Sequence, residues 1–184
     1  VTHFSPDLDA IVSAWLVKKY LPGFSGAEIT FVPAGGTLEG RDPDNDPNVV
    51  HVDTGMGKFD HHQTSKRTSA TQIVFEYLIE KSYIKNQTQE KAIERLVGQV
   101  TDIDHFGQIS WPEPDNDRYN LMVDAILDGW RLTYARESLK VVELGFLLVE
   151  AIVKQLDYKF WGEEILKMEG KEFNSKWGRS IGFE

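Results

Sequence analysis

The sequence contains no cysteine, so disulfide scaffolds, cysteine–zinc sites and thiol nucleophiles are excluded. No uninterrupted apolar run approaches the ~18 residues that a membrane-spanning helix needs. A basic-then-apolar leader is also missing. These absences predict a cytoplasmic protein with no membrane partner.

Basic residues are scarce relative to acids. There are 20 Lys and Arg against 29 Asp and Glu, which gives a formal net charge of −9. This balance argues against an extended nucleic-acid surface, although it leaves room for a small local phosphate site. With 41% hydrophobic and 27% charged residues in 184, the composition is that of an ordinary globular domain.

Hydrophobic spacing predicts strands that alternate with helices early in the chain and helices that dominate later. We expect strands over 1–3, 27–32, 48–53 and 58–62, and helices over 9–20, 68–80, 87–101, 118–132, 137–156 and 162–168. This order predicts an α/β fold, with a parallel sheet flanked by helices followed by a mostly helical C-terminal segment.

The same order predicts two parts. Residues 1–106 would form an α/β metal-binding domain, and residues 107–184 a helical cover that ends in a short strand or hairpin over 171–184. Because the sequence opens inside an expected strand, and its last strand or hairpin needs a partner, we expect further residues beyond both ends.

All five histidines lie near aspartates at expected strand or helix ends. The four clusters are His3 with Asp7 and Asp9; His51 with Asp53; Asp60-His61-His62; and Asp102 with Asp104 and His105. Because ligands gather at the carboxyl edge of a parallel sheet, the clusters can converge. Histidine plus carboxylate without cysteine suits Mn, Mg, Fe or Zn better than copper, and the carboxylates suffice for two ions that share a bridging aspartate.

Several of these residues have simpler interpretations. Asp7 in Ser-Pro-Asp would cap a helix start. For His51 we favour a structural role. The pair Lys66-Arg67 is typical of plain surface, although beside a metal site it could hold a phosphate. The acidic run at 42–46 lacks the glycine and glutamate of a calcium loop, and we interpret it as a solvated turn.

Taken together, the clusters resemble the four motifs of the DHH phosphoesterase superfamily, which includes RecJ-type exonucleases, nanoRNases and family II inorganic pyrophosphatases. The resemblance covers roughly residues 2–106. The run 59–63, Phe-Asp-His-His-Gln, and the helix over 143–156 are similar to the DHH-like branch named for melanocyte proliferating gene, which is associated with RNA exonuclease activity.

The resemblance implies a role for each residue that matches a motif. The implied metal ligands are His3 and Asp7 for one ion, Asp9, His61 and Asp102 for the other, and Asp53 as the bridge. His62 would face the substrate phosphate, and Asp60 would orient the neighbouring histidines. The implied substrate contacts are His62, Lys66, Arg67 and His105. The fourth motif can slide by two residues, so Asp104 stays an alternative to Asp102.

The predicted function is therefore a manganese-dependent phosphohydrolase of DHH type. Two Mn ions, with Mg, Co or Zn as alternatives, would activate water against a phosphoester or phosphoanhydride bond of a nucleotide or short oligonucleotide. The competing hypotheses are a non-catalytic metal- or nucleotide-binding module and one domain of a longer nuclease. Homodimerisation is left open.

Overall fold

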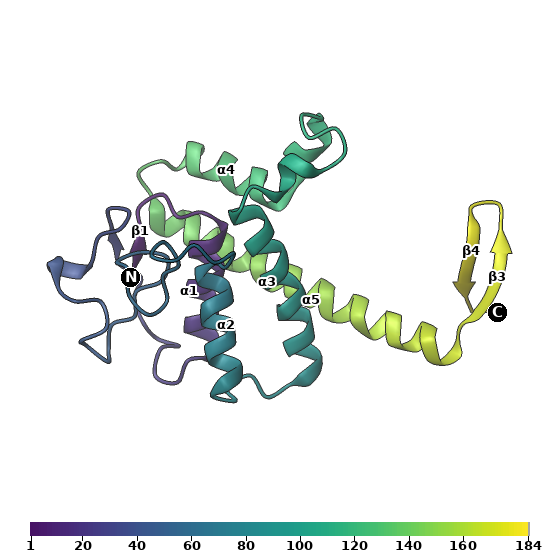
Figure 1. Cartoon of the computed structure of the whole chain (residues 1–184), viewed down its shortest axis with the longest axis horizontal. Coiled ribbons are helices and arrows are strands. Elements are labelled where there is room, and N and C mark those ends of the chain that lie inside the picture. Colours follow the sequence, from purple (N-terminus) through teal and green to yellow (C-terminus); the bar gives the residue numbers. More distant parts are fainter. Residues whose placement is uncertain (184) are drawn as a thin grey trace.

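A computed structural model describes residues 1–183 as a mixed α/β protein in which helices predominate (Figure 1). The strands are β1 Thr2–His3, β2 Phe31–Val32, β3 Lys171–Ser175 and β4 Gly178–Gly182. The α-helices are α1 Leu8–Tyr20, α2 Ala70–Glu80, α3 Gln87–Asp104, α4 Val123–Thr133 and α5 Ser138–Glu169. The 3-10 helices are η1 Leu38–Gly40, η2 Gly107–Ser110 and η3 Asp117–Leu121.

The parallel sheet is smaller than the sequence predicts. It contains only β1 and β2, which pair in parallel with α1 as the crossover between them. Residues 49–52 run beside β1, since the amino group of Val1 donates to the Val50 carbonyl at 2.7 Å and the Val52 N–H donates to the Val1 carbonyl at 2.9 Å. The predictions of full strands over 48–53 and 58–62 are wrong, because the chain turns at Asp53, which has φ +53°, and closes a tight loop through an Asp53 N–H bond to Phe59.

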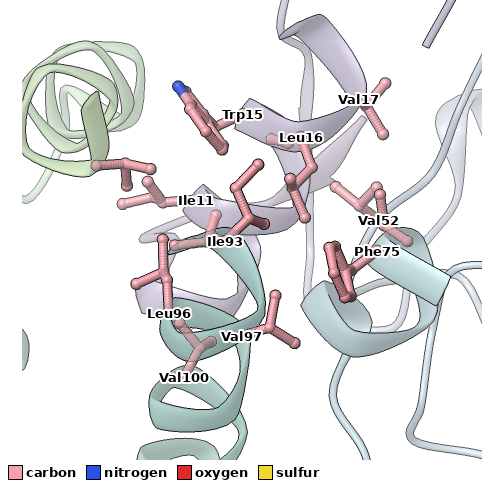
Figure 2. Close-up of a cluster of buried hydrophobic side chains, with 14 of the residues drawn as sticks. Ile11, Trp15, Leu16, Val17, Val52, Phe75, Ile93, Leu96, Val97 and Val100 are labelled. Carbon is pink, nitrogen blue, oxygen red and sulfur yellow. The ribbon is translucent and has the colours of Figure 1, made fainter. Parts of the chain in front are cut away.

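Helix α1 forms the centre of the core. Every residue from Leu8 to Val17 is buried, because α2, α3 and α5 pack around the helix. Figure 2 shows Ile11 and Leu16 of α1 among the aliphatic side chains of α3 and the Phe75 ring of α2. Helix α5 comes so near that a Cβ on Gly145 would lie 2.7 Å from Ile11 Cγ2, and only glycine permits this approach.

The C-terminal half differs from the expected element bounds in two places. The two helices expected over 137–156 and 162–168 are one continuous helix, α5, because Gly162 lowers helix propensity without breaking the backbone bonding. The helix expected over 118–132 is divided into η3 and α4 at Met122, whose backbone is extended. The hairpin over the last residues is confirmed by the antiparallel pair β3–β4. The division into domains at residue 106 stays a prediction.

In the part of the chain that the structure describes, no helix combines the length and the apolar character that crossing a membrane requires.

Candidate metal centre

The predicted metal-binding side chains come from five separate segments that meet beyond the end of β1. These segments are the end of β1, the first turn of α1, the loops around residues 53 and 60–62, and the last turn of α3. Three groups of ligand atoms there lie close enough together to hold a cation: His3, Asp7 and Asp53; Asp53, His61 and His62; and His61, Asp104 and His105.

Asp53 is the centre of this cluster and is almost fully buried, at 3% exposure. Its Oδ2 accepts a hydrogen bond from His3 Nε2 at 3.2 Å, and its Oδ1 lies 3.4 Å from His61 Nε2. Burial alone would raise the pKa of Asp53, but His3 and His61 hold it below its usual value.

Asp9 is held rigidly by the start of α2. Its two carboxylate oxygens accept the backbone N–H groups of Ala70 and Thr71, both at 2.8 Å. Its Oδ2 also lies 3.6 Å from His61 Nε2. Burial, together with the negative charge of Asp53, raises the pKa of Asp9 to about 7. A cation near Asp9 would therefore stabilise its ionised carboxylate.

Asp7 caps a helix and also lies in a candidate ligand group. It caps α1, because its Oδ1 accepts the Ala10 N–H at 3.1 Å, which confirms the capping prediction. Its carboxylate also lies with the imidazole of His3 and the carboxylate of Asp53 in one candidate ligand group. Burial and the charge of Asp53 raise the pKa of Asp7. Although burial acts to lower it, the bond to Asp53 raises the pKa of His3 to about 9.

Three buried polar atoms in the cluster have no hydrogen-bond partner. They are Asp53 Oδ1, His61 Nε2 and Asp104 Oδ2, and the two carboxylate oxygens lie 3.4 and 3.7 Å from the same histidine nitrogen. Buried polar atoms are almost always bonded, so three that converge from separate segments need an explanation. Histidine and carboxylate donors fit a divalent cation such as Mn²⁺ or Zn²⁺.

Of the two candidate aspartates at the end of α3, the structure brings Asp104 to the cluster and does not bring Asp102. Asp104 Oδ2 lies 3.7 Å from His61 Nε2 and 3.8 Å from His105 Nε2. Burial and the charge of Asp53 raise the pKa of Asp104. Asp102 instead forms an ion pair with Arg67 at 2.5 Å, with its carboxylate against Gly107. Of the two alternatives that the sequence left open, the geometry favours Asp104, which alone belongs to a candidate ligand group among the described residues.

Asp60 orients His62, as the resemblance implies. The buried Asp60 carboxylate accepts the backbone N–H groups of Met56 at 2.7 Å and of His62 at 3.1 Å. Its Oδ1 also bonds the His62 Nδ1 at 2.7 Å, which leaves Nε2 as the nitrogen available to a ligand. His62 is half exposed and lines a hollow of about 300 Å³ together with residues of the cluster.

The remaining predicted residues lie around this centre. His105 bonds the Thr68 carbonyl at 2.9 Å and belongs to one candidate ligand group, whereas Lys66 is exposed and Arg67 is engaged by Asp102. His51 stays outside the cluster. Its Nε2 accepts the Leu38 N–H at 3.0 Å and its Nδ1 donates to the Pro43 carbonyl at 3.1 Å, as a structural histidine does.

One residue near the site escaped the sequence analysis. Arg131 of α4 donates to Ser5 Oγ at 3.2 Å, and its charge acts to lower the pKa of Asp7. It lies more than 120 positions along the chain from the residues it contacts and belongs to no motif. No signal in the sequence could have identified it, because only the packing of α4 brings it to the site.

Nothing matches this chain in comparisons with protein-family models, curated proteins and solved structures.

Proposed function

We propose that this chain is a DHH-type, metal-dependent phosphohydrolase that cleaves a phosphoester or phosphoanhydride bond of a nucleotide or short oligonucleotide. The observation that carries the proposal is the convergence of three unbonded buried polar atoms on one point beside a hollow. These atoms meet one another only as ion pairs, in which two buried carboxylate oxygens lie 3.4 and 3.7 Å from one histidine nitrogen. A divalent cation would offset negative charge that a single imidazolium leaves uncompensated.

The donor set divides naturally between two cations. His3 and Asp7 would hold one, Asp9, His61 and Asp104 the other, and Asp53 would be shared. When bound, two divalent ions would offset the four carboxylate charges, polarise a water molecule and neutralise charge that develops on phosphorus-bound oxygens. Mn²⁺ is the proposed native ion, with Mg²⁺, Co²⁺ or Zn²⁺ as alternatives.

The chain itself supplies the groups that orient the substrate. With its Nδ1 bonded to Asp60, His62 presents Nε2 to a phosphoryl oxygen or to the departing oxygen. Hydrolysis joins the oxygen of water to phosphorus and breaks the bond to the departing oxygen, which takes up a proton. Because Asp60 is fixed by two backbone N–H groups, it holds the imidazole in one orientation.

The test is hydrolysis of an aryl phosphodiester, an aryl phosphate and pyrophosphate by the chelator-treated protein, with and without added Mn²⁺. We expect metal-dependent release of product from at least one of these substrates. Asp53→Asn should lower the rate by at least about 100-fold, because the variant loses the shared carboxylate. Asp102→Asn, the matched control, should retain activity.

Binding of Mn²⁺ without turnover of any of the three substrates would contradict the proposal. That result would support the competing hypothesis of a metal- or nucleotide-binding module.

A further inference from the structure

The hollow beside the candidate metal centre has a part of its wall that the candidate ligands do not form. Ala34 and Gly35, shortly after the end of β2, line the hollow of about 300 Å³. The same lining includes the carboxylates of Asp7, Asp53 and Asp104. Because carboxylates repel an anion, an anionic ligand of this hollow depends on bound cations and on donors in the rest of the wall.

The chain forms a tight turn at this part of the wall. The Gly36 N–H donates to the Pro33 carbonyl at 2.8 Å, which closes a turn over residues 33–36. Gly35, in the third position, has φ +73°, whereas Ala34, in the second position, has no positive φ. This combination defines a type II turn, which needs glycine or asparagine in the third position. A Cβ on Gly35 would meet nothing within 4 Å, so the backbone conformation requires the glycine and crowding does not.

The backbone donors in the middle of this turn are free. In the part of the chain that the structure describes, neither the Ala34 N–H nor the Gly35 N–H has a hydrogen-bond partner. In a type II turn, ψ of about +120° at the second residue turns the next peptide plane, so the third N–H points away from the bond that closes the turn. Outward N–H groups of turns are among the backbone donors that bind anions. The Gly35 N–H is therefore a donor available to a ligand of the hollow.

The turn is held tightly against the loop that carries Asp53. Thr54 Oγ1 donates to the Gly36 carbonyl at 3.0 Å. A Cβ on Gly55 would lie 2.9 Å from Thr37 Cγ2 and 3.3 Å from the Gly36 carbonyl oxygen, so only glycine permits this approach. The turn thus keeps a fixed position relative to the Asp53 carboxylate. A donor that is already in place needs no rearrangement when a charged group arrives.

A second turn of the same type lies elsewhere in the chain. The Phe24 N–H donates to the Leu21 carbonyl at 3.2 Å, with Pro22 in the second position and Gly23 at φ +88° in the third. Gly23 is exposed, its Cβ would meet nothing within 4 Å, and it does not line the hollow. The two glycines therefore share a conformation and differ in what lies in front of them.

We propose that the Gly35 N–H binds an oxygen of the phosphoryl group of the substrate. The inference deepens the proposed function and rests on it, because it assigns a further donor to the same hollow. The class of ligand is a phosphate or a phosphate ester. The backbone donor adds no charge of its own, so the ligand enters only when divalent cations offset the three carboxylates of the lining. His62 Nε2 is the second donor of the chain that faces this ligand.

The first test observes the amide itself. The protein is labelled with [15N]glycine, loaded with diamagnetic Zn²⁺ and titrated with inorganic phosphate, and amide spectra are recorded by nuclear magnetic resonance. We expect the Gly35 amide proton to move downfield, because a hydrogen bond to an anion deshields it. The Gly23 amide should not move. In the chelated protein, phosphate should shift neither signal.

The second test changes the conformation of the turn. Asparagine and valine are similar in size, but asparagine tolerates a positive φ and valine does not. Gly35→Val should therefore turn the N–H away from the hollow, and Gly35→Asn should keep it there. For the Mn²⁺-loaded protein, calorimetry with inorganic phosphate should show at least about 10-fold weaker binding in Gly35→Val than in Gly35→Asn, as loss of one hydrogen bond to a charged group predicts.

Two controls separate this effect from a general loss of structure. Gly23→Val imposes the same backbone conflict outside the hollow and should bind phosphate as the unaltered chain does. Elemental analysis should find the same amount of Mn²⁺ in both Gly35 variants, because Gly35 belongs to none of the candidate ligand groups.

Three results would overturn the proposal: a Gly35 amide that shifts no more than the Gly23 amide, equal phosphate affinities of Gly35→Val and Gly35→Asn, or no phosphate binding by the metal-loaded chain. The proposed function fails by a different result. If the Gly35 amide responds to phosphate and no substrate is hydrolysed, the anion site stands and the phosphohydrolase does not.

Discussion

Exchanging the two aspartates at the end of α3 for asparagine, one at a time, tests the geometry of the candidate metal centre most directly. Asp104→Asn removes a carboxylate that faces His61 from within the cluster, at 3.7 Å from its Nε2. Asp102→Asn removes one that pairs with Arg67 outside the cluster. The two substitutions are identical in chemistry and two residues apart, so a difference between them reports on position alone.

The effect on metal binding follows from the loss of an anionic ligand. Changes to residues that only support ligands already weaken metal binding by about 10–100-fold, so loss of a ligand itself should cost at least about 100-fold at one of the two ions. We therefore expect Asp104→Asn to retain about one Mn²⁺ per chain after dialysis and Asp102→Asn to retain two. Mn²⁺ electron paramagnetic resonance and elemental analysis measure both values.

The effect on metal-free stability should have the opposite sign. Asp53 Oδ1 and Asp104 Oδ2 both lie within 3.7 Å of His61 Nε2, so they are no more than about 7 Å apart. At an effective dielectric constant of about 20, two such charges repel by on the order of 2 kcal/mol, whereas a protonated His61 at 3.7 Å from Asp104 attracts it by on the order of 4 kcal/mol, so burial decides the sign. Burial and this repulsion raise the pKa of Asp104 despite the nearby His61, so its ionised form destabilises the metal-free fold at neutral pH. Asp104→Asn should thus leave the melting temperature of the chelated protein unchanged or higher.

Two results would refute this reasoning. One is loss of an ion from Asp102→Asn with Asp104→Asn intact. The other is a marked loss of metal-free stability in Asp104→Asn, which would show that the carboxylate has a purely structural role.

Three further predictions concern His51, His61 and the length of the substrate. His51→Ala should lower the free energy of unfolding by about 2 kcal/mol in denaturant titrations while Mn²⁺ stoichiometry stays the same, because two backbone groups lose their partner. Binding of Mn²⁺ at pH 7 should release at least one proton per chain into a weakly buffered solution. The pKa of His61 is raised to about 9, chiefly by Asp53, so this histidine is protonated in the metal-free protein at pH 7 and must lose a proton to bind a metal. An unchanged pH on addition of Mn²⁺ would count against His61 as a ligand. In a length series of labelled RNA and DNA, activity should not rise beyond roughly 16 nucleotides, since the acidic chain offers no long positive groove; a steady rise with length would contradict a small substrate.

The sequence by itself was enough to predict which side chains would cluster at the candidate centre and where most of the helices lie. Histidines and aspartates at the ends of expected elements were enough to predict a cluster, because a crossover unit such as β1–α1–β2 brings such ends to one edge. Asp7 before an apolar run predicted the start of α1, since capping is a local interaction. The hairpin at the end of the chain was likewise visible in local alternation.

Tertiary structure decided what local patterns cannot express. Residues 48–53 have strand composition, but the backbone bonds that join them to this edge of the sheet are both at Val1, before β1 begins, so among the described residues the parallel sheet stays at two strands. Asp102 and Asp104 differ by about 200° around a helix, so one faces His61 and the other faces Arg67, and only the docking of α3 determines which. On α5, Tyr158, Trp161 and Met168 follow a helical spacing that a buried helix face would also show. Only the structure shows that these side chains are exposed, on the side of α5 away from the ion pair between Glu163 and Arg95 of α3.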